Sequence, residues 1–337
     1  MQKPHSPWTF SDLTPEPILH AVEKATNLRF TGLVAPLPSY INRVYELQDM
    51  EGKRHIVKFY RPGRWTRPAL EDEHRFLVDC HGAELPVVAP QYLHTGETLG
   101  ETGGIFFALF PKRAGRELDI SEDRDWEQLG RLIGRLHNVA AAGRAEHRIC
   151  LHPDRSLDRD ARTLLSGGMP AEMQNSFRTL VSRLQQNIRE LFTGQPSIRL
   201  HGDLHRKNIL HRPGEGLLLI DFDDMMTGPA IQDLWLLLPD RPTQCPREIN
   251  LLMEGYQSFR KLPTGSMALV EGLRAMRQIY FLAWCQRQQK DARFAATFPE
   301  WGTGAFWRQE LRDLEQQLHR TVSAETTRPS FHFIADL

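Results

Sequence analysis

The chain has 337 residues, which is long enough for two lobes with separate hydrophobic cores. Lysine plus arginine and aspartate plus glutamate each total 42, so no overall charge points to nucleic acid or an anionic membrane as a partner. The longest apolar runs, residues 105–110 and 234–238, are too short to cross a bilayer, and residues 1–14 lack the apolar stretch of a secretion signal.

The four cysteines are scattered along the chain without paired spacing: Cys80, Cys150, Cys245 and Cys285. Such scatter favours reduced thiols in a cytoplasmic protein over a disulfide framework. We therefore expect a soluble, cytoplasmic enzyme that is a monomer and that binds neither nucleic acid nor membrane.

In chain order, the first predicted element is a helix over residues 13–30. Residues 44–47 and 54–60 then read as two strands of a hairpin, with Gly52 in the turn. A helix is expected over residues 70–79.

Two further strands are predicted at residues 87–92 and 104–110. Apolar residues at helical spacing from Trp126 to Val139 follow and predict an amphipathic helix. We place a lobe boundary after the last strand. Residues 1–110 would then form a nucleotide-binding lobe and residues 111–337 a mostly helical lobe, a small antiparallel β-rich part followed by a larger helical part.

The second half of the chain reads as mainly helical. Residues 150–170 are expected to be rich in loops, and residues 177–192 to form an amphipathic helix that ends before a glycine and a proline. Helices are also predicted over residues 273–284 and 306–318. The tail, residues 323–337, is expected to be irregular.

A polar loop between two apolar runs, near residue 203, carries the strongest functional signal. Asp203 and Asn208 lie five residues apart, and Asp221 ends the next apolar run. Kinase catalytic loops have this Asp-then-Asn spacing, followed by an aspartate that binds metal. The order of these residues predicts a phosphoryl-transfer site that uses ATP.

Each residue type suits one task in that chemistry. Mg²⁺ prefers oxygen ligands, which Asn208 and Asp221 supply as an amide and a carboxylate. Asp203 would orient the acceptor hydroxyl and take its proton. His205, two residues further on, would donate a hydrogen bond to the transferring phosphate.

Two simpler interpretations of this loop stay open. Aspartate and asparagine are common turn residues. His201, Asp203 and His205 also have the alternating spacing of half a transition-metal site, although no further histidine or cysteine cluster at ligand spacing accompanies them.

Lys58 lies within an apolar β run, where an unpaired ammonium is costly to bury. We expect it to pair with the ATP phosphates and with a helix glutamate, Glu73 by preference and Glu71 as the fallback. Alternation along the strand would otherwise place it on a solvated face. Ser39 and Asn42, in the loop before the hairpin, are candidates to cover the phosphates, with an ordinary surface turn as the alternative.

With His201-Gly202-Asp203, Asn208 and Asp221 in place, the chain resembles the aminoglycoside phosphotransferase/choline kinase branch of the protein-kinase-like fold. Further short segments resemble a group of bacterial stress-response protein kinases within that branch, and they occur in order from about Ser39 to Trp284. These segments are Ser39-Tyr40, Asn42-Arg43-Val44-Tyr45, Val57-Lys58-Phe59-Tyr60-Arg61-Pro62, Gly228-Pro229-Ala230, Gln232-Asp233-Leu234-Trp235 and Leu273-Arg274-Ala275-Met276-Arg277.

The resemblance implies an α+β, bilobal, protein-kinase-like fold and an ATP- and Mg²⁺-dependent kinase that phosphorylates serine or threonine in proteins during stress. It implies that Asp203 is the proton acceptor, Asn208 and Asp221 are metal ligands and Ser39 contacts ATP. Asp221 would also be an active-site residue in its own right. The Phe222-Asp223 pair departs from the Phe-Gly of ordinary protein kinases.

Two rival functions remain. Small-molecule kinases often line the acceptor pocket with acidic residues, and Asp223, Asp224 and Asp240 are candidates for that role, with an aminoglycoside, choline or homoserine as acceptor. The other rival is a nucleotide-binding module without catalysis. The presence of every expected chemical group weighs against this second rival.

Overall fold

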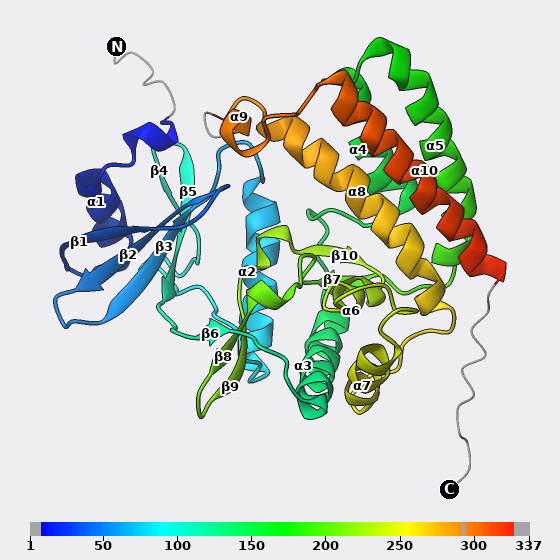
Figure 1. The fold of residues 1–337 in the computed structure, drawn as a ribbon. Coiled ribbons are helices and arrows are strands. Elements are labelled where there is room, and N and C mark those ends of the chain that lie inside the picture. Colours follow the sequence, from blue (N-terminus) through cyan, green and yellow to red (C-terminus); the bar gives the residue numbers. More distant parts are fainter. Residues whose placement is uncertain (1–7, 292–293, 327–337) are drawn as a thin grey trace, which may run out of the picture. The chain divides into compact units, whose positions relative to one another are not determined.

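The structure is a computed structural model that describes residues 8–291 and 294–326 (Figure 1). Contacts within the chain divide it into two compact units. Unit 1 comprises Met1–Arg148, Arg199–Met225 and Leu236–Arg260, and unit 2 comprises Ile149–Ile198, Met226–Trp235 and Lys261–Leu337. All residues predicted from the sequence to form the phosphoryl-transfer site lie in unit 1.

Unit 1 contains a five-stranded antiparallel sheet with the strand order β1-β2-β3-β5-β4. The strands are β1 Phe30–Leu37, β2 Arg43–Asp49, β3 Arg54–Phe59, β4 Gly100–Thr102 and β5 Ile105–Pro111. The predicted β2–β3 hairpin is confirmed. Gly52 in its turn has a φ of 86°, a conformation that glycine adopts without steric cost.

The helix predicted over residues 13–30 is shorter in the structure, where α1 spans Pro15–Thr26. Asn27 takes the left-handed conformation with a φ of 58° and caps the helix end. The chain is then free to enter β1, a strand that the sequence interpretation missed.

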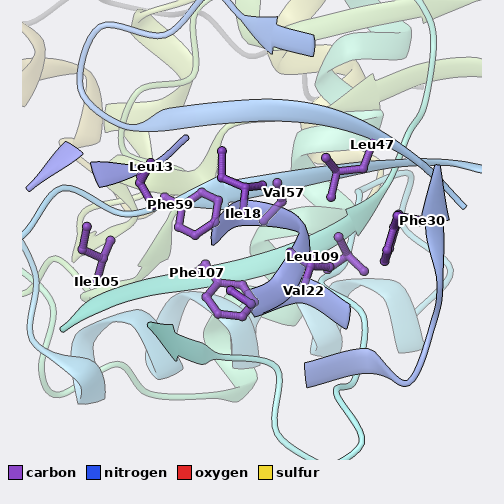
Figure 2. Packing of buried hydrophobic residues seen from close by; sticks show 11 residues of the cluster. Leu13, Ile18, Val22, Phe30, Leu47, Val57, Phe59, Ile105, Phe107 and Leu109 are labelled. Carbon is purple, nitrogen blue, oxygen red and sulfur yellow. The ribbon is translucent and has the colours of Figure 1, made fainter. Parts of the chain in front are cut away.

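Helix α1 packs on one face of the sheet (Figure 2). Ile18 and Val22 of the helix meet inward-facing side chains of the strands, among them Val57 and Phe59 of β3. Burial of this apolar surface at about 25 cal/mol per Å² is the main contribution to the stability of this part of unit 1.

The other face of β3 carries Lys58, because successive side chains along a strand point to opposite sides. Helix α2, Arg67–Gly82, lies on this side, where its Leu70 joins a buried cluster with Tyr60, Leu99 and Ala108. Glu73 lies three residues after Leu70, on the buried side of the helix. Strand alternation and helix periodicity together therefore bring Lys58 and Glu73 to the same layer.

The strand predicted at residues 87–92 is wrong. Val87 forms only an isolated bridge to Leu219. Pro86 precedes this segment and Pro90 lies within it. Neither has a backbone N–H to donate to a ladder, which explains why the apolar run does not extend the sheet.

The remainder of unit 1 contains a three-stranded sheet and two packed helices. The sheet has the order β6-β8-β9, with β6 Arg116–Glu117, β8 Ile209–Arg212 and β9 Gly216–Leu219. The helices are α3 Asp123–Ala142, which confirms the amphipathic helix predicted there, and α7 Pro246–Gln257. They approach so closely that a Cβ at Gly130 would overlap the Leu252 carbonyl oxygen, and one at Gly255 the Glu127 carbonyl oxygen.

Unit 2 is mainly helical. Its helices are α4 Asp158–Ser166, α5 Ala171–Arg189, α6 Ile231–Trp235, α8 Leu269–Gln288, α9 Phe294–Thr297 and α10 Gly304–Thr326. Strand β10 covers Met226–Gly228, and β7, Ile198–Leu200, begins in unit 2 and ends in unit 1.

The helices predicted around residues 177, 273 and 306 are confirmed as α5, α8 and α10. The loop-rich interpretation of residues 150–170 is wrong over α4, where buried Ala161 and Leu164 repeat at helical spacing in a segment too polar and short to stand out. Residues 323–326, expected to be irregular, belong to α10, and the rest of the predicted tail lies outside the described residues.

The expected order, an antiparallel β-rich part followed by a mainly helical part, is thus confirmed, whereas the exact lobe boundary after residue 110 stays a prediction. Across residues 8–291 and 294–326, no helix combines the length and apolarity that a bilayer crossing requires.

The close approach of α3 and α7 yields a stability prediction. Gly255→Ala should lower the free energy of unfolding by about 1–3 kcal/mol, because the added methyl group overlaps backbone that cannot move aside easily. The measurement is urea unfolding of both proteins. Gly82→Ala, at the end of α2 with open space around it, is the matched control and should not be destabilised. An unchanged midpoint for Gly255→Ala would contradict the packing described.

Candidate phosphoryl-transfer site

The β8–β9 hairpin places Asn208 beside Asp221. Ile209 pairs with Leu219, so the residues one step beyond this pair, Asn208 and Ile220, face each other. The Ile220 N–H donates to the Asn208 carbonyl at 3.0 Å, and Asp221 follows directly. Two residues 13 apart in sequence are thereby held at the same end of one hairpin by backbone hydrogen bonds.

Asn208 also fixes the loop that carries Asp203. The side-chain Nδ2 of Asn208 donates to the Asp203 backbone carbonyl at 2.9 Å. Since the amide nitrogen is used in this way, the Oδ1 atom of Asn208 is the group left to bind a cation. The Asp203 side chain is 27% exposed, so its carboxylate is accessible to an acceptor while its backbone is held.

His205 lies beside Asp203, with its Nε2 3.5 Å from Asp203 Oδ2. His201 has a different position: it is fully buried, and its Nε2 lies 2.8 Å from the Ile220 carbonyl oxygen, to which it donates. The described part of the chain contains no group of three or more His, Cys, Asp or Glu side chains placed to hold a metal ion. His201 is therefore used to hold the hairpin, which removes it from the transition-metal interpretation.

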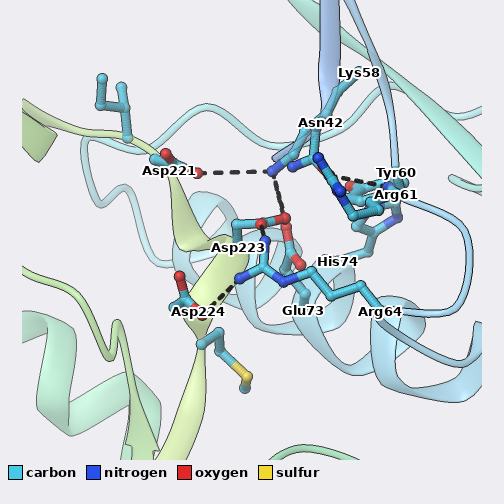
Figure 3. A network of polar contacts seen from close by, with 12 residues as sticks. Asn42, Lys58, Tyr60, Arg61, Arg64, Glu73, His74, Asp221, Asp223 and Asp224 are labelled. Carbon is cyan, nitrogen blue, oxygen red and sulfur yellow. Dashed lines mark hydrogen bonds and ion pairs between the residues drawn. The ribbon is translucent and has the colours of Figure 1, made fainter. Parts of the chain in front are cut away.

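Lys58 lies among three carboxylates, as Figure 3 shows for two of them. Its Nζ is 2.9 Å from Asp223 Oδ1, 3.7 Å from Asp221 Oδ1 and 4.0 Å from Glu73 Oε1. The predicted Lys58–Glu73 partnership is present, but Asp223 is the nearer partner. The Lys58 side chain is only 13% exposed, whereas that of Asp221 is 58% exposed and accessible to solvent.

Burial and the neighbouring charges shift the pKa values of this cluster in opposite directions. Burial alone would lower the pKa of the Lys58 ammonium, but the negative charges of Asp223, Glu73 and Asp221 raise it above its usual value. Burial raises the pKa of Glu73 to about 7, although Lys58 and Arg148 both lower it. Burial would likewise raise the pKa of Asp223, but Lys58 and Arg64 hold it below its usual range.

Arg148 was not predicted from the sequence, yet it lies at the centre of this cluster. Its side chain is fully buried, its Nε donates to the Met225 carbonyl at 2.7 Å and its Nη2 to the Asp223 carbonyl at 2.5 Å. Its Nη1 is 3.5 Å from Glu73 Oε2, and the guanidinium lies 3.9 Å from the centre of the Trp65 ring. Arg148 thus fixes both the helix glutamate and the backbone that follows Asp221.

Arg64 is the second residue that the sequence interpretation missed. Its Nη1 contacts Asp223 Oδ2, and its Nη2 donates to Asp224 Oδ1 at 2.7 Å. The suggestion that Asp223 and Asp224 line an acceptor pocket is therefore not supported: both carboxylates are engaged by cations of unit 1, and Asp223 is buried. Asp240, the third candidate, accepts from the Arg241 N–H at 2.7 Å and is exposed.

The loop between β1 and β2 contains Ser39 and Asn42. The Asn42 side chain is buried and its Oδ1 accepts from the Arg61 N–H at 3.1 Å, so it braces the loop against the end of β3. Ser39 is only half-buried, and its hydroxyl makes no hydrogen bond within the described part of the protein. Of the two candidates, Ser39 is the one whose side chain is left for a ligand.

Three polar side chains next to Lys58, those of Tyr60, His74 and Thr98, form a row of hydrogen bonds. The Tyr60 hydroxyl lies 2.7 Å from His74 Nε2, and His74 Nδ1 lies 2.8 Å from the Thr98 hydroxyl. Burial, together with the charges of Lys58 and Arg148, lowers the pKa of His74 to about 3, so the ring is neutral at physiological pH. Lys58 Nζ is 5.1 Å from the centre of the Tyr60 ring.

A family model described as the phosphotransferase enzyme family, APH, matches residues 34–269 of the chain. The chain belongs to this family. Curated relatives include stress response kinase A from Shigella flexneri, 38% identical over 320 residues, which cover 93% of this chain and 95% of the relative. Serine/threonine protein kinase RdoA from Salmonella typhimurium is 36% identical, covering 92% and 94%. The protein is therefore a kinase.

Solved structures of other kinases share the fold at low sequence identity. Amicoumacin kinase hAmiN superposes with a TM-score of 0.69 at 17% identity, covering 88% of this chain and 93% of that one. Choline kinase LicA from Streptococcus pneumoniae gives a TM-score of 0.63 at 16% identity, covering 90% and 98%. These likenesses confirm the predicted α+β, protein-kinase-like fold.

The raised pKa of Glu73 predicts a pH-dependent contribution to stability. The pKa of the Glu73 carboxyl is 4.5 in the unfolded chain and about 7 in the folded chain, so the folded state binds the proton more tightly. The free energy of unfolding should therefore fall as pH rises through this window, by about 3 kcal/mol in total from this group. In Glu73→Gln this contribution is absent, so the variant should gain stability relative to wild type between pH 4.5 and 7.

Urea unfolding at several pH values measures this difference. Glu71→Gln, on the half-exposed side of the same helix and paired with Arg67, is the matched control for loss of a carboxylate. A stability difference between wild type and Glu73→Gln that does not change with pH would contradict the raised pKa.

Proposed function

We propose that this kinase transfers the γ-phosphate of ATP, with Mg²⁺, to serine or threonine hydroxyls of proteins. The main support for a protein as the acceptor is similarity to named relatives. The chain is 36–38% identical, over more than nine-tenths of its length, to relatives named as stress response and serine/threonine protein kinases. A role in a stress response, a cytoplasmic location and a monomeric state belong to the same proposal. The four cysteines are free thiols, which suits a reducing compartment.

In this proposal Lys58 contacts the phosphates of ATP, and Glu73 and Arg148 hold Lys58 and its surroundings in position. The Ser39 hydroxyl contacts the nucleotide from the β1–β2 loop. Its half-buried position in a loop held by Asn42 supports this role.

The Asn208 Oδ1 atom and the exposed Asp221 carboxylate would hold Mg²⁺. Their chemistry fits, since one neutral and one anionic oxygen lie at the same end of a hairpin, and the amide nitrogen is already used elsewhere. When bound, Mg²⁺ supplies neutralisation of phosphate charge. Asp221 also contributes its own negative charge near Lys58, which is its second role in the site.

Asp203 aligns the acceptor hydroxyl and takes its proton, while His205 donates to the phosphate being transferred. Both side chains are partly exposed, and they lie 3.5 Å apart. A base must come within hydrogen-bond reach of the proton that it accepts, and the braced loop of Asp203 provides that fixed position.

The second candidate function keeps the chemistry but changes the acceptor to a small molecule. The observation in its favour is that the structural neighbours are named as kinases of amicoumacin, aminopropanol and choline. Among the acidic residues considered for its acceptor pocket, Asp240 is the one still exposed.

Incubation with γ-labelled ATP separates the two acceptors. Purified protein is mixed with a cell extract divided by size into macromolecules and metabolites. Label on serine or threonine of extract proteins, dependent on intact Asp203, is expected. Label that enters only a metabolite would replace the protein acceptor with the small-molecule one.

Asp203→Ala should lower kcat by about 10²–10⁴-fold, because the acceptor hydroxyl loses its base while the nucleotide site remains. Asp221→Ala should cost at least about as much, since a metal ligand is lost. The measurement is steady-state transfer from ATP, with thermal unfolding to verify folding. Asp158→Asn, which removes a surface partner of Arg162, is the control and should keep wild-type activity. Near-normal turnover by either site variant would refute the assignment.

A further inference from the structure

The nearest partner of Lys58 is neither its helix glutamate nor a solvent-facing group. Lys58 Nζ is 2.9 Å from Asp223, compared with 4.0 Å from Glu73 (Figure 3). If Lys58 contacts the phosphates of ATP, as proposed above, its ammonium must share or leave the Asp223 carboxylate when the nucleotide binds. The ease of this exchange then contributes to ATP affinity.

The exchange is costly unless Asp223 keeps another cation. Its side chain is only 7% exposed, and a buried carboxylate that loses its partner is strongly destabilised. Arg148 does not solve this problem directly, because its Nη2 donates to the backbone carbonyl of Asp223 and not to the carboxylate.

Arg64 is placed to solve it. Its guanidinium contacts Oδ2 of Asp223, whereas Lys58 contacts Oδ1, so the two cations hold different oxygens of the same carboxylate. The second arm of Arg64 reaches Asp224 at 2.7 Å, which fixes the guanidinium in this position. The Arg64 side chain is 13% exposed and starts from the loop between β3 and α2, close to the strand that carries Lys58.

We propose that Arg64 is a positioning residue for nucleotide binding: it neutralises Asp223 and so leaves Lys58 available to the ATP phosphates. Without Arg64, Lys58 is the one side-chain cation among the described residues that contacts the Asp223 carboxylate. Asp223 then holds Lys58 more firmly. The inference rests on the proposed contact of Lys58 with ATP. It assigns a function to a residue that contacts no reacting atom.

The test is a double-mutant cycle between Arg64 and Asp223. Arg64→Gln should raise the KM and the dissociation constant for ATP by about tenfold or more, within the usual range of coupling between two sites, with a smaller change in kcat. Removing the carboxylate in the same protein, as Arg64→Gln with Asp223→Asn, should return both constants most of the way to wild type.

This recovery distinguishes the proposal from two others. A merely structural ion pair would lower the thermal unfolding temperature without a specific change in ATP affinity, and a direct Arg64–phosphate contact would not be restored by loss of Asp223. ATP affinity that stays weak in the double variant, or is unchanged in Arg64→Gln, overturns the proposal. Arg64→Lys, which keeps one cation near Asp223, should give an intermediate KM and replaces Arg64→Gln if that variant does not fold.

Two controls complete the experiment. Arg67→Gln removes a nearby arginine that pairs with Glu71 and Glu97 on the surface, and it should leave the KM for ATP unchanged. Lys58→Ala tests the underlying function: unchanged ATP affinity in this variant would refute the lysine contact itself. Weaker ATP binding in Lys58→Ala combined with normal binding in Arg64→Gln would refute the inference alone.

Discussion

The site depends on the balance of charge around one buried ammonium. Lys58 lies on the side of β3 that faces α2, where solvent screening is weak and each unpaired charge carries a large desolvation cost. The structure meets this constraint by surrounding Lys58 with carboxylates and by giving two of those carboxylates, Glu73 and Asp223, a second cation each. The arginines serve the site without belonging to its reactive groups.

The same balance of charge fits the proposed binding of a divalent cation. Three positively charged side chains, Lys58, Arg64 and Arg148, lie among four carboxylates. The remaining negative charge is concentrated at Asp221, which is the most exposed of the four carboxylates. Solvent at this carboxylate can be replaced by a ligand. Under the proposed function, a metal ion that enters from solvent would meet this exposed carboxylate, whose nearest side-chain cation in the cluster is Lys58 at 3.7 Å.

The parts of the site that were predictable from sequence are those marked by short-range sequence patterns. Asp203, Asn208 and Asp221 were identified by their spacing within one loop and hairpin, Lys58 by its place in an apolar strand upstream of that loop, and Glu73 by the repeat of its helix. Arg64 and Arg148 were missed because they find their partners about 160 and 75 positions away along the chain, which no periodic pattern encodes.

The errors in the fold have similar causes. Strand β1 was missed because a single left-handed residue, Asn27, ends the preceding helix, and the strand falsely predicted near Val87 looked apolar but is limited by its prolines. In the first case one left-handed residue, and in the second case two prolines, outweighed the composition of the neighbouring residues.

The hydrogen bond from the Asn208 amide to the Asp203 carbonyl also constrains which residue type this position accepts. A carboxylate is ordinarily the stronger magnesium ligand, yet at this place it would turn a lone pair toward another lone pair and leave the loop without its brace. An aspartate at this position would favour metal affinity, whereas an asparagine also provides the hydrogen bond that holds the loop. Under the proposed function, Asn208 would bind the ion less strongly than an aspartate would, but it keeps the loop of Asp203 fixed, and Asp221 would supply the negative charge that attracts the metal.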